Sequence, residues 1–375
     1  MYILAITTFS ILAYLEVFNR HIVDKYKFLL LFFCYIFLII HDGLRWETGT
    51  DWMPYTDFFN NLTLKYSIED SPFEIGYTLF MYIIRLITDD YTLYLVIHAI
   101  FFYSCFFYCI TSISISPLVS ILIFYTITLP YLGMNRQFLA MAICSVALVF
   151  LLKNNFKIFF LLVFVAFLFH RTALVALLAI ICKKKINLFW LIGIISFAIL
   201  IALLDVPNRL IHITTALSGL DEGTIQKLDI YTHGGDNQTV SFLSTILSLI
   251  KKLIWCGLLL VFDNKVDNKD NNYYTLFNLY ILGCVLYIIF NGTIFQIFVS
   301  RALLYFNIIE MFIIPYALTI FKQNYGKLIL MIILSLYCFI NIKKGFNNYA
   351  TRGMKDLFEP YKGIFINTDY QRQSH

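Results

Sequence analysis

The feature that most limits the folds open to this sequence is the recurrence of apolar runs, with short polar stretches between them, from Met1 to Asn341. Of its 375 residues 60% are hydrophobic and 14% charged, whereas a soluble domain carries roughly 25% charged residues. Backbone groups in lipid must hydrogen-bond within their own segment, so membrane spans built from these runs should be helical. We therefore predict an all-α fold, a polytopic transmembrane helical bundle.

Several runs are shorter than the ~20 residues that a perpendicular span needs, which leaves room for re-entrant or discontinuous pieces, and we expect about 11–13 spans. The apolar runs are 1–18, 28–41, 74–88, 91–111, 117–133, 137–152, 156–169, 172–182, 187–204, 240–262, 273–290, 297–320 and 327–342. Residues 1–345 should form one membrane domain with outer loops at about 42–73 and 205–239, followed by a polar tail, 346–375. The first run lacks a basic region before it, so we read it as a retained span.

Lysine and arginine gather in cytoplasmic loops, and their positions therefore predict the orientation. Basic residues at 20–27 and 183–185 place these two loops in the cytoplasm and put the amino terminus and loop 42–73 outside. Lys153 and Lys157 mark another cytoplasmic turn. Counting every run from 74 to 152 as a full span would instead put Lys153 outside. One piece in that stretch, either 74–88 or 117–136, should therefore not cross the membrane, and Pro130 and Gly133 make 117–136 a candidate broken helix.

The sequence also excludes several classes of protein. The formal net charge of +5 is scattered between apolar runs, as topology determinants are, and does not indicate a nucleic-acid partner. There is no Gly-x-x-x-x-Gly-Lys-Ser/Thr loop and no His-Glu-x-x-His helix, so neither a P-loop ATPase nor a zinc hydrolase is predicted. We expect no cofactor and no metal.

Two outer segments combine acids, aromatic residues and glycines. The first contains the run from Gly43 through Arg45, Trp46, Glu47, Gly49, Asp51, Trp52 and Tyr55, and later Glu74, Gly76 and Tyr77. Its aromatic residues fit a belt at the membrane interface. They also fit a sugar site, because Trp and Tyr faces stack on sugars and short acids hydrogen-bond to hydroxyls. The second segment, 205–239, is either a mobile loop or a lid over an outer site.

Five cationic side chains approach the predicted outer face, and they are Arg45, Arg136, His170, Arg171 and Arg301. Any one of them could anchor a helix by extending its charged end to the membrane interface, or could form a hydrogen bond between helices. Five on one side indicate a site for an anion. Arginine suits a diphosphate because its planar fork stays charged and donates two hydrogen bonds at once.

Taken in order, these motifs resemble the EpsG-like, Wzy-type polymerases of bacterial O-antigen and exopolysaccharide. The resemblance covers roughly residues 1–345. The motifs that carry it are Gly43-Leu-Arg45-Trp46-x-x-Gly49-Thr50-Asp51-Trp52-x-x-Tyr55, Glu74-x-Gly76-Tyr77, Asn135-Arg136-Gln137-x-x-Ala140, Phe169-His170 and Arg301-x-x-x-Tyr305-Phe306. Arg171 departs from the pattern, where a small or hydroxyl residue is commoner.

The resemblance implies a glycosyltransferase of the bacterial inner membrane whose active site faces the periplasm. Its substrates would be undecaprenyl-diphosphate-linked oligosaccharide repeat units, with no nucleotide sugar or ATP. A growing glycan would leave undecaprenyl diphosphate and join the non-reducing end of a new unit. The expected partners are the membrane lipid, a chain-length co-polymerase and a flippase.

From residue type and the resemblance together we assign provisional roles. Arg45, Arg136 and Arg301 would hold the donor diphosphate and stabilise charge on the leaving group. His170 or Asp51 would be the general base. The remaining predicted substrate-binding residues are Trp46, Glu47, Trp52, Tyr55, Glu74, Tyr77, Arg171 and Tyr305.

Two other functions remain open at this stage. A flippase for the same lipid-linked unit would also keep charges in the membrane, although transporters usually show internal repeats, and none is visible here. An O-antigen ligase or an acyltransferase of the same pathway is the second alternative.

Overall fold

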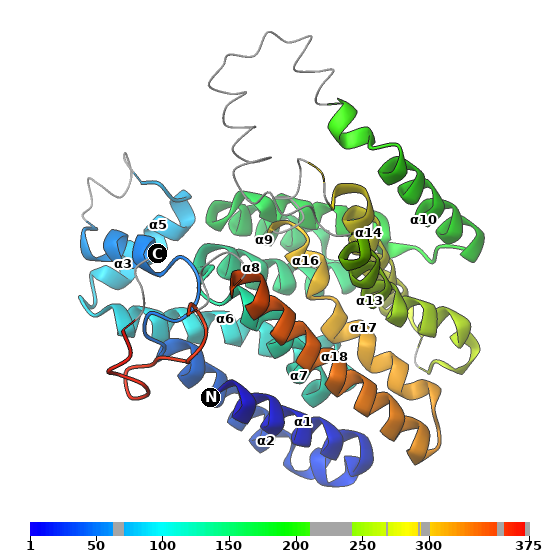
Figure 1. Ribbon diagram of the computed structural model, residues 1–375, viewed down its shortest axis with the longest axis horizontal. Helices are drawn as coiled ribbons and strands as arrows, with labels where there is room; N and C mark the ends of the chain where they lie inside the picture. The colour runs from blue at the N-terminus through cyan, green and yellow to red at the C-terminus, as the bar shows by residue number, and fades with distance from the viewer. Residues whose placement is uncertain are drawn as a thin grey trace. The chain divides into compact units, whose positions relative to one another are not determined.

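The computed structural model describes residues 1–62, 71–210, 242–267, 269–291, 293, 301–350 and 356–371. Within these ranges all regular structure is helical apart from two isolated β-bridges, as the sequence predicts (Figure 1). The chain divides into two compact units. The first comprises Met1–Leu177 and Phe321–His375, and the second comprises Leu178–Ile320.

The described part of the first unit contains nine α-helices, and capping groups explain where several of them begin. They are α1 (Tyr2–Phe18), α2 (Arg20–Gly43), α3 (Trp52–Asn60), α5 (Ile75–Arg85), α6 (Tyr91–Ile113), α7 (Pro117–Thr128), α8 (Asn135–Leu152), α9 (Phe156–Phe169) and α18 (Asn324–Ala350). The Asp90 carboxylate accepts the N–H of Thr92 at 2.7 Å at the start of α6, and such caps satisfy amides that a helix end leaves unpaired. Pro117 occupies the first turn of α7, where its missing N–H costs nothing.

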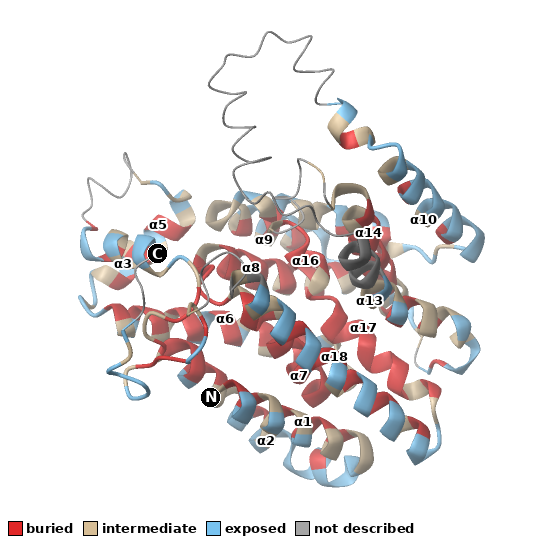
Figure 2. Ribbon diagram, viewed as in Figure 1, coloured by how far each residue is buried: buried red, intermediate tan, exposed pale blue. Residues whose placement is uncertain are grey.

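The interior of this unit is aromatic, and its outer helices expose apolar side chains. Phe102 stacks on Phe138 with 4.8 Å between ring centres, and Phe106 lies 4.6 Å from Phe124. Helices α7 and α8 are buried on almost every face (Figure 2). By contrast, Phe28 on α2 is 84% exposed. Apolar side chains exposed on the outer helices in this way are those of a protein whose surroundings are lipid rather than water.

Four helical segments of the described ranges are long and apolar enough to cross a bilayer, namely α6, α8, Asn324–Asn347 of α18 and, in the second unit, α14 (Asn271–Phe290). Six shorter apolar segments accompany them, among them α1, α5 and α9. The protein is thus an all-α, polytopic membrane protein, as predicted.

Both ends of helix α5 lie near α3. At its start Glu74 bonds to Arg136 on α8, and Arg136 also bonds to α3 through Tyr55. At its end the Arg85 guanidinium lies 5.3 Å from the ring centre of Phe59, one turn along α3. With 11 residues at ~1.5 Å each, α5 is too short for the ~30 Å hydrocarbon core. These contacts favour 74–88 as the run that does not cross, which stays a prediction.

Helix α7, the other candidate, contacts the end of α1 at its start and the end of α2 near its own end. The Glu16 carboxylate, near the end of α1, accepts the backbone N–H groups of Leu118 and Val119 at 2.9 and 3.0 Å. Toward the opposite end of α7, the Tyr125 hydroxyl lies 3.3 Å from His41 near the end of α2. The chain then leaves the α-helical path at residues 129–134 before α8 begins at Asn135. This break, predicted from Pro130 and Gly133, is where the candidate site is built.

Two predicted spans take unexpected forms. The run 172–182 folds as a 3₁₀ helix, η2 (Arg171–Lys183), which rises ~2.0 Å per residue and so covers more distance than an α-helix of equal length. In the run 297–320 the described residues form two short pieces, α16 (Leu304–Asn307) and α17 (Glu310–Ala317), with Pro315 inside the second. Residues 294–300 lie outside the described ranges.

The second unit is organised around α14 (Asn271–Phe290), which packs against α10 (Leu188–Leu203), α13 (Phe242–Val261), α16 and α17. The Asn278 side-chain amide of α14 donates to the carbonyl oxygens of Cys182 and Lys184 at 2.9 and 2.7 Å. Most of the predicted outer loop 205–239, and with it the predicted lid, lies outside the described residues.

Candidate active site

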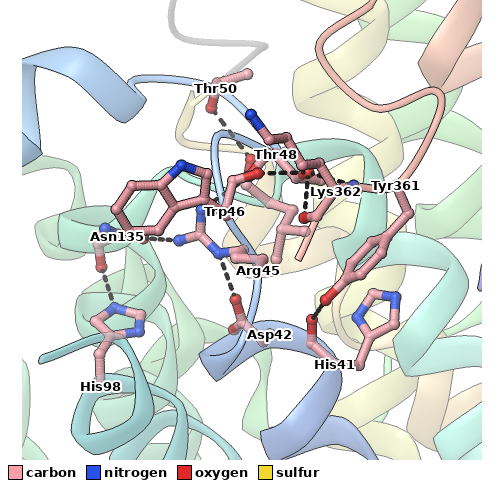
Figure 3. A network of polar contacts seen from close by, with 11 residues as sticks. His41, Asp42, Arg45, Trp46, Thr48, Thr50, His98, Asn135, Tyr361 and Lys362 are labelled. Carbon is pink, nitrogen blue, oxygen red and sulfur yellow. Dashed lines mark hydrogen bonds and ion pairs between the residues drawn. The ribbon is translucent and has the colours of Figure 1, made fainter. Parts of the chain in front are cut away.

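The loop that follows α2 is built around Arg45, whose side chain is 1% exposed (Figure 3). Its Nε donates to Asp42 Oδ1 at 2.8 Å, its Nη1 to the Thr48 carbonyl oxygen at 2.9 Å, and its Nη2 to Asn135 Oδ1 at 2.9 Å. The guanidinium also lies 5.6 Å from the ring centre of Trp52, within cation–π range. This buried guanidinium ties the loop to the start of α8.

Asn135 connects this network to the next residue, Arg136. Its side chain accepts from Arg45, and its backbone oxygen lies 3.1 Å from His98 Nε2 on α6 (Figure 3). The first turn of α8 is therefore fixed from two other elements, and the direction of the Arg136 side chain is fixed with it.

Two glycines allow the loop after α2 to touch the break before α8. Gly49 and Gly133 have φ of +101° and +103°, which side-chain-bearing residues rarely adopt. A Cβ on Gly49 would lie 2.3 Å from the Leu132 carbonyl oxygen, and one on Gly133 would lie 2.0 Å from that of Thr50. The same approach lets the Thr50 N–H donate to the Leu132 oxygen at 2.8 Å.

Arg136 forms the centre of a second, more accessible group. Its Nη1 donates to Glu74 Oε2 at 2.6 Å, its Nε to the Tyr55 hydroxyl at 3.2 Å, and its guanidinium lies 4.6 Å from the ring centre of Phe73. The other Glu74 oxygen accepts the Arg171 backbone N–H at 3.4 Å. The Arg136 side chain keeps 24% of its surface exposed, so it is accessible where Arg45 is not.

Charges in this second group oppose the effect of burial. Burial alone would raise the pKa of the Glu74 carboxyl, but the Arg136 guanidinium, with a smaller effect of His170, holds that pKa below its ordinary value. Burial raises the pKa of the Tyr55 hydroxyl despite the nearby Arg136. Glu74 is therefore ionised and Tyr55 protonated at neutral pH. With the side chain of Arg171 exposed, the group carries one guanidinium charge in excess of its carboxylate, which suits an anion.

Contacts with Thr172 indicate which nitrogen of His170 carries a proton. The Thr172 backbone N–H donates to His170 Nδ1 at 3.3 Å, and the Thr172 hydroxyl lies 2.7 Å from the same nitrogen. When Nδ1 accepts, the neutral ring carries its proton on Nε2. In that tautomer Nε2 is a hydrogen-bond donor.

The predicted aromatic residues divide into two kinds. Tyr55 and Tyr77 are 3% and 0% exposed, and the Tyr77 hydroxyl lies 2.7 Å from that of Tyr94. Tyr55 contacts Arg136 directly, and the Tyr77 ring packs against that of Tyr55 with 5.5 Å between ring centres. Trp46 and Trp52 are only half-buried and meet edge to face with 5.3 Å between ring centres.

The two acids of the loop also differ in their surroundings. Glu47 and Asp51 both have positive φ, 45° and 55°, a conformation that Asp tolerates better than most residues. The Glu47 carboxylate accepts from Lys362 Nζ at 2.6 Å. Asp51 is exposed at the start of α3.

The residues that sequence reasoning missed belong to the C-terminal segment, 356–371. The Trp46 N–H donates to the Lys362 carbonyl oxygen at 2.9 Å, and the Tyr361 hydroxyl donates to the His41 carbonyl oxygen at 2.7 Å. This segment lies beside the loop after α2 (red and blue in Figure 1). Its sequence has no apolar periodicity, so nothing in it indicated these contacts. Asp42 and Asn135 were also missed as partners of Arg45.

Of the predicted site residues, the structure brings Tyr55, Glu74, Arg136, His170 and Arg171 together in the first unit. Arg301 and Tyr305 belong to the second unit, where Arg301 is half-buried and Tyr305 is 6% exposed. Within the described residues no three His, Cys, Asp or Glu side chains gather in a way that could hold a metal ion.

Comparison with known proteins gives one match. A family model described as the EpsG family matches residues 3–362. No curated protein and no solved structure matches the chain.

Proposed function

The chain belongs to the EpsG family, and from this premise we propose that it is the polymerase of an O-antigen or exopolysaccharide repeat unit. As a membrane glycosyltransferase it moves a growing glycan from undecaprenyl diphosphate to the non-reducing end of a new lipid-linked unit. The observation that carries the proposal is the accessible group formed by Arg136, Arg171 and His170 around the Glu74 carboxylate. Family membership supports a polymerase-like activity, and this group supplies the charges that the reaction requires.

The proposed reaction exchanges one bond at the anomeric carbon of the donor sugar. The bond to the diphosphate oxygen breaks, and the diphosphate leaves with the electron pair. The acceptor hydroxyl oxygen bonds to that carbon, and its proton passes to a base. Because the sugar–diphosphate bond is already activated, the transfer uses neither a nucleotide sugar nor ATP, and arginine takes the part that a metal ion plays elsewhere.

Residue roles follow from accessibility. Arg136 and Arg171 bind the diphosphate, and their charge stabilises the leaving group as it develops. His170 donates from Nε2 to a diphosphate oxygen, in keeping with the tautomer that Thr172 favours. Asp51, exposed at the start of α3, takes the proton of the acceptor hydroxyl. Arg45 holds the loop in place.

We place the reaction at the outer face of the bacterial inner membrane. The basic loops of the sequence put the amino terminus and the loop after α2 on that side. The substrate must first be carried across the membrane by a flippase. A chain-length co-polymerase is the expected partner during elongation.

The proposal is tested on a lipopolysaccharide gel from a deletion strain complemented with wild type, Arg136→Ala or Arg20→Ala. Arg20 is 71% exposed at the start of α2, at the opposite end of that helix from the loop after it, and serves as the matched control. We expect the deletion to leave lipid A–core with a single repeat, and wild type and Arg20→Ala to restore the ladder. Arg136→Ala, present at normal levels in the membrane, should not.

The gel also distinguishes the alternatives. A normal ladder in the deletion strain would contradict an O-antigen polymerase, and the same comparison would then be made on secreted exopolysaccharide. Repeat units trapped on the cytoplasmic side would identify a flippase. Polymer that is not attached to lipid A would identify a ligase, and unchanged chain length an acyltransferase.

A further inference from the structure

We propose that the C-terminal segment 356–371 is a built part of the active site and that Lys362 is a positioning residue for Arg136. The part of this inference that concerns catalysis rests on the proposed function. The part that concerns contact and sidedness does not.

The segment supplies the hydrogen-bond partners that the loop after α2 lacks within itself. The Trp46 and Gly49 N–H groups donate to the carbonyl oxygens of Lys362 and Leu357, both at 2.9 Å. The Ile364 N–H donates to the Leu44 oxygen at 3.0 Å. Buried backbone groups need such partners, so the segment determines the path of this loop.

Side chains reinforce the same contact. The Thr48 hydroxyl donates to the Lys362 carbonyl oxygen at 2.8 Å and accepts the Lys362 N–H at 3.0 Å. Lys362 Nζ, on a side chain only 9% exposed, donates to the Glu47 carboxylate at 2.6 Å. Glu47 has positive φ, a conformation that persists only where the surroundings hold it. Lys362 therefore fixes both the backbone and the charge of the loop (Figure 3).

A continuous chain of contacts leads from Lys362 to the reacting group. The Thr48 hydroxyl donates to the Lys362 backbone carbonyl oxygen, and the Thr48 carbonyl oxygen accepts from Arg45 Nη1. Arg45 bonds to Asn135, which is followed directly by Arg136. A loop that shifts would move the first turn of α8, and a misplacement of about 1 Å at such a group can cost about 100-fold in rate.

Both ends of the described chain also meet at this loop. The Tyr2 hydroxyl donates to the Phe358 carbonyl oxygen at 2.8 Å, and the Tyr361 hydroxyl donates to His41 at the end of α2. It follows that one side of the membrane holds the start of α1, the loop after α2 and the C-terminal segment. Sequence alone left the side of the tail open.

Sidedness is measured without any activity assay. Single cysteines replace Met53 and Phe365, which are 58% and 79% exposed, and Arg20 as a reference at the opposite end, in a full chain without its native cysteines. We expect a membrane-impermeant maleimide to label Met53→Cys and Phe365→Cys from the same side and Arg20→Cys only after permeabilisation. Labelling of Met53→Cys and Phe365→Cys from opposite sides would overturn the proposal. If the cysteine-free chain does not insert, alkaline phosphatase fused after residue 371 of the wild-type chain gives the same answer.

Positioning is measured by charge exchange. Lys362→Met should lower kcat for polymerisation of lipid-linked units about tenfold with little change in KM, whereas Lys343→Met, at an exposed position of α18, should not. Glu47→Lys combined with Lys362→Glu should recover most of the rate, which a loss of sugar contacts at Glu47 would not allow. Equal rates for Lys362→Met and Lys343→Met, or no recovery in the exchange, would overturn the role. Inactive wild type would contradict the proposed function alone, because the labelling result still stands.

Discussion

Arg45 and Arg136 are the same type of residue in neighbouring motifs, yet they differ in what they can reach. Arg45 is buried by partners up to 90 positions away in sequence, whereas Arg136 keeps part of its guanidinium exposed. The motifs identified both residues, but burial depends on contacts between distant segments, which a single sequence does not encode. The sequence therefore singled out both residues but did not show which one is buried and which is accessible.

The tautomer of His170 leads to a test that separates a hydrogen-bond donor from a general base. Glutamine at this position can still donate from a nitrogen near Nε2, but it cannot take up a proton. If His170 donates to the leaving group, His170→Gln should retain part of the polymerisation rate and His170→Ala should lose about 100-fold or more. Rates are compared at equal protein levels in isolated membranes. Equally inactive variants would favour His170 as the base.

The Glu74–Arg136 ion pair should stabilise the fold in a pH-dependent way. The pKa of Glu74 is lowered in the folded protein, so its contribution is present above the unfolded value of about 4.3 and is lost as pH falls through the folded pKa. Glu74→Gln should therefore cost about 1–3 kcal/mol at pH 7, between the values for exposed and buried pairs. The Tm difference from wild type in detergent should narrow below about pH 4. Asp57→Asn, at an exposed position of α3, is the control.

At the scale of elements, the break between α7 and α8 contributes more to the candidate site than either helix does. Pro130 and Gly133 predicted that break, and the structure confirms it. The short α5 and the 3₁₀ form of η2 were not predictable, because an apolar run gives the same pattern whether it crosses fully, lies at one face or winds more tightly. Length alone indicated that some runs were unusual.

The close approach at this break predicts a large effect from one methyl group. Gly133→Ala would place a Cβ 2.0 Å from the Thr50 carbonyl oxygen at a φ of +103°, and backbone strain of this kind alone costs about 1–3 kcal/mol. We expect a clear fall in Tm and loss of polymer. Gly193→Ala on α10, where a Cβ would have nothing within 4 Å, should be neutral or stabilising by up to about 1 kcal/mol. An unchanged Tm for Gly133→Ala would show that the loop does not touch the break.

At the scale of the whole molecule, composition and apolar runs were enough to predict an all-α polytopic membrane protein. They were not enough to count the membrane crossings, because whether that number is odd or even depends on whether α5 crosses. The polar tail was also uninformative, since its contacts are hydrogen bonds that involve backbone groups, ring contacts of Phe358 and Tyr361, and one ion pair, and none of these requires a periodic sequence pattern.

The crossing of α5 is directly measurable. Reporter fusions after Asn61 and after Asp89 should report the same side of the membrane, and a fusion after Ile115, beyond α6, should report the opposite side. The physical reason is the length of α5, 11 residues, against a hydrocarbon core of ~30 Å. Opposite sides for the first two fusions would mean that α5 spans.

The contact between Lys362 and Glu47 has a consequence for biogenesis. The two residues are 315 positions apart, and a ribosome adding roughly 5–20 residues per second needs about 15–60 s to make that stretch. In the later part of this interval the nascent chain carries Arg45, Arg136 and His170 but not yet the segment that sets them in place. The newly inserted protein would then be inactive on lipid-linked substrate until its last residues have been translocated. A prematurely terminated chain would occupy the membrane without elongating any glycan.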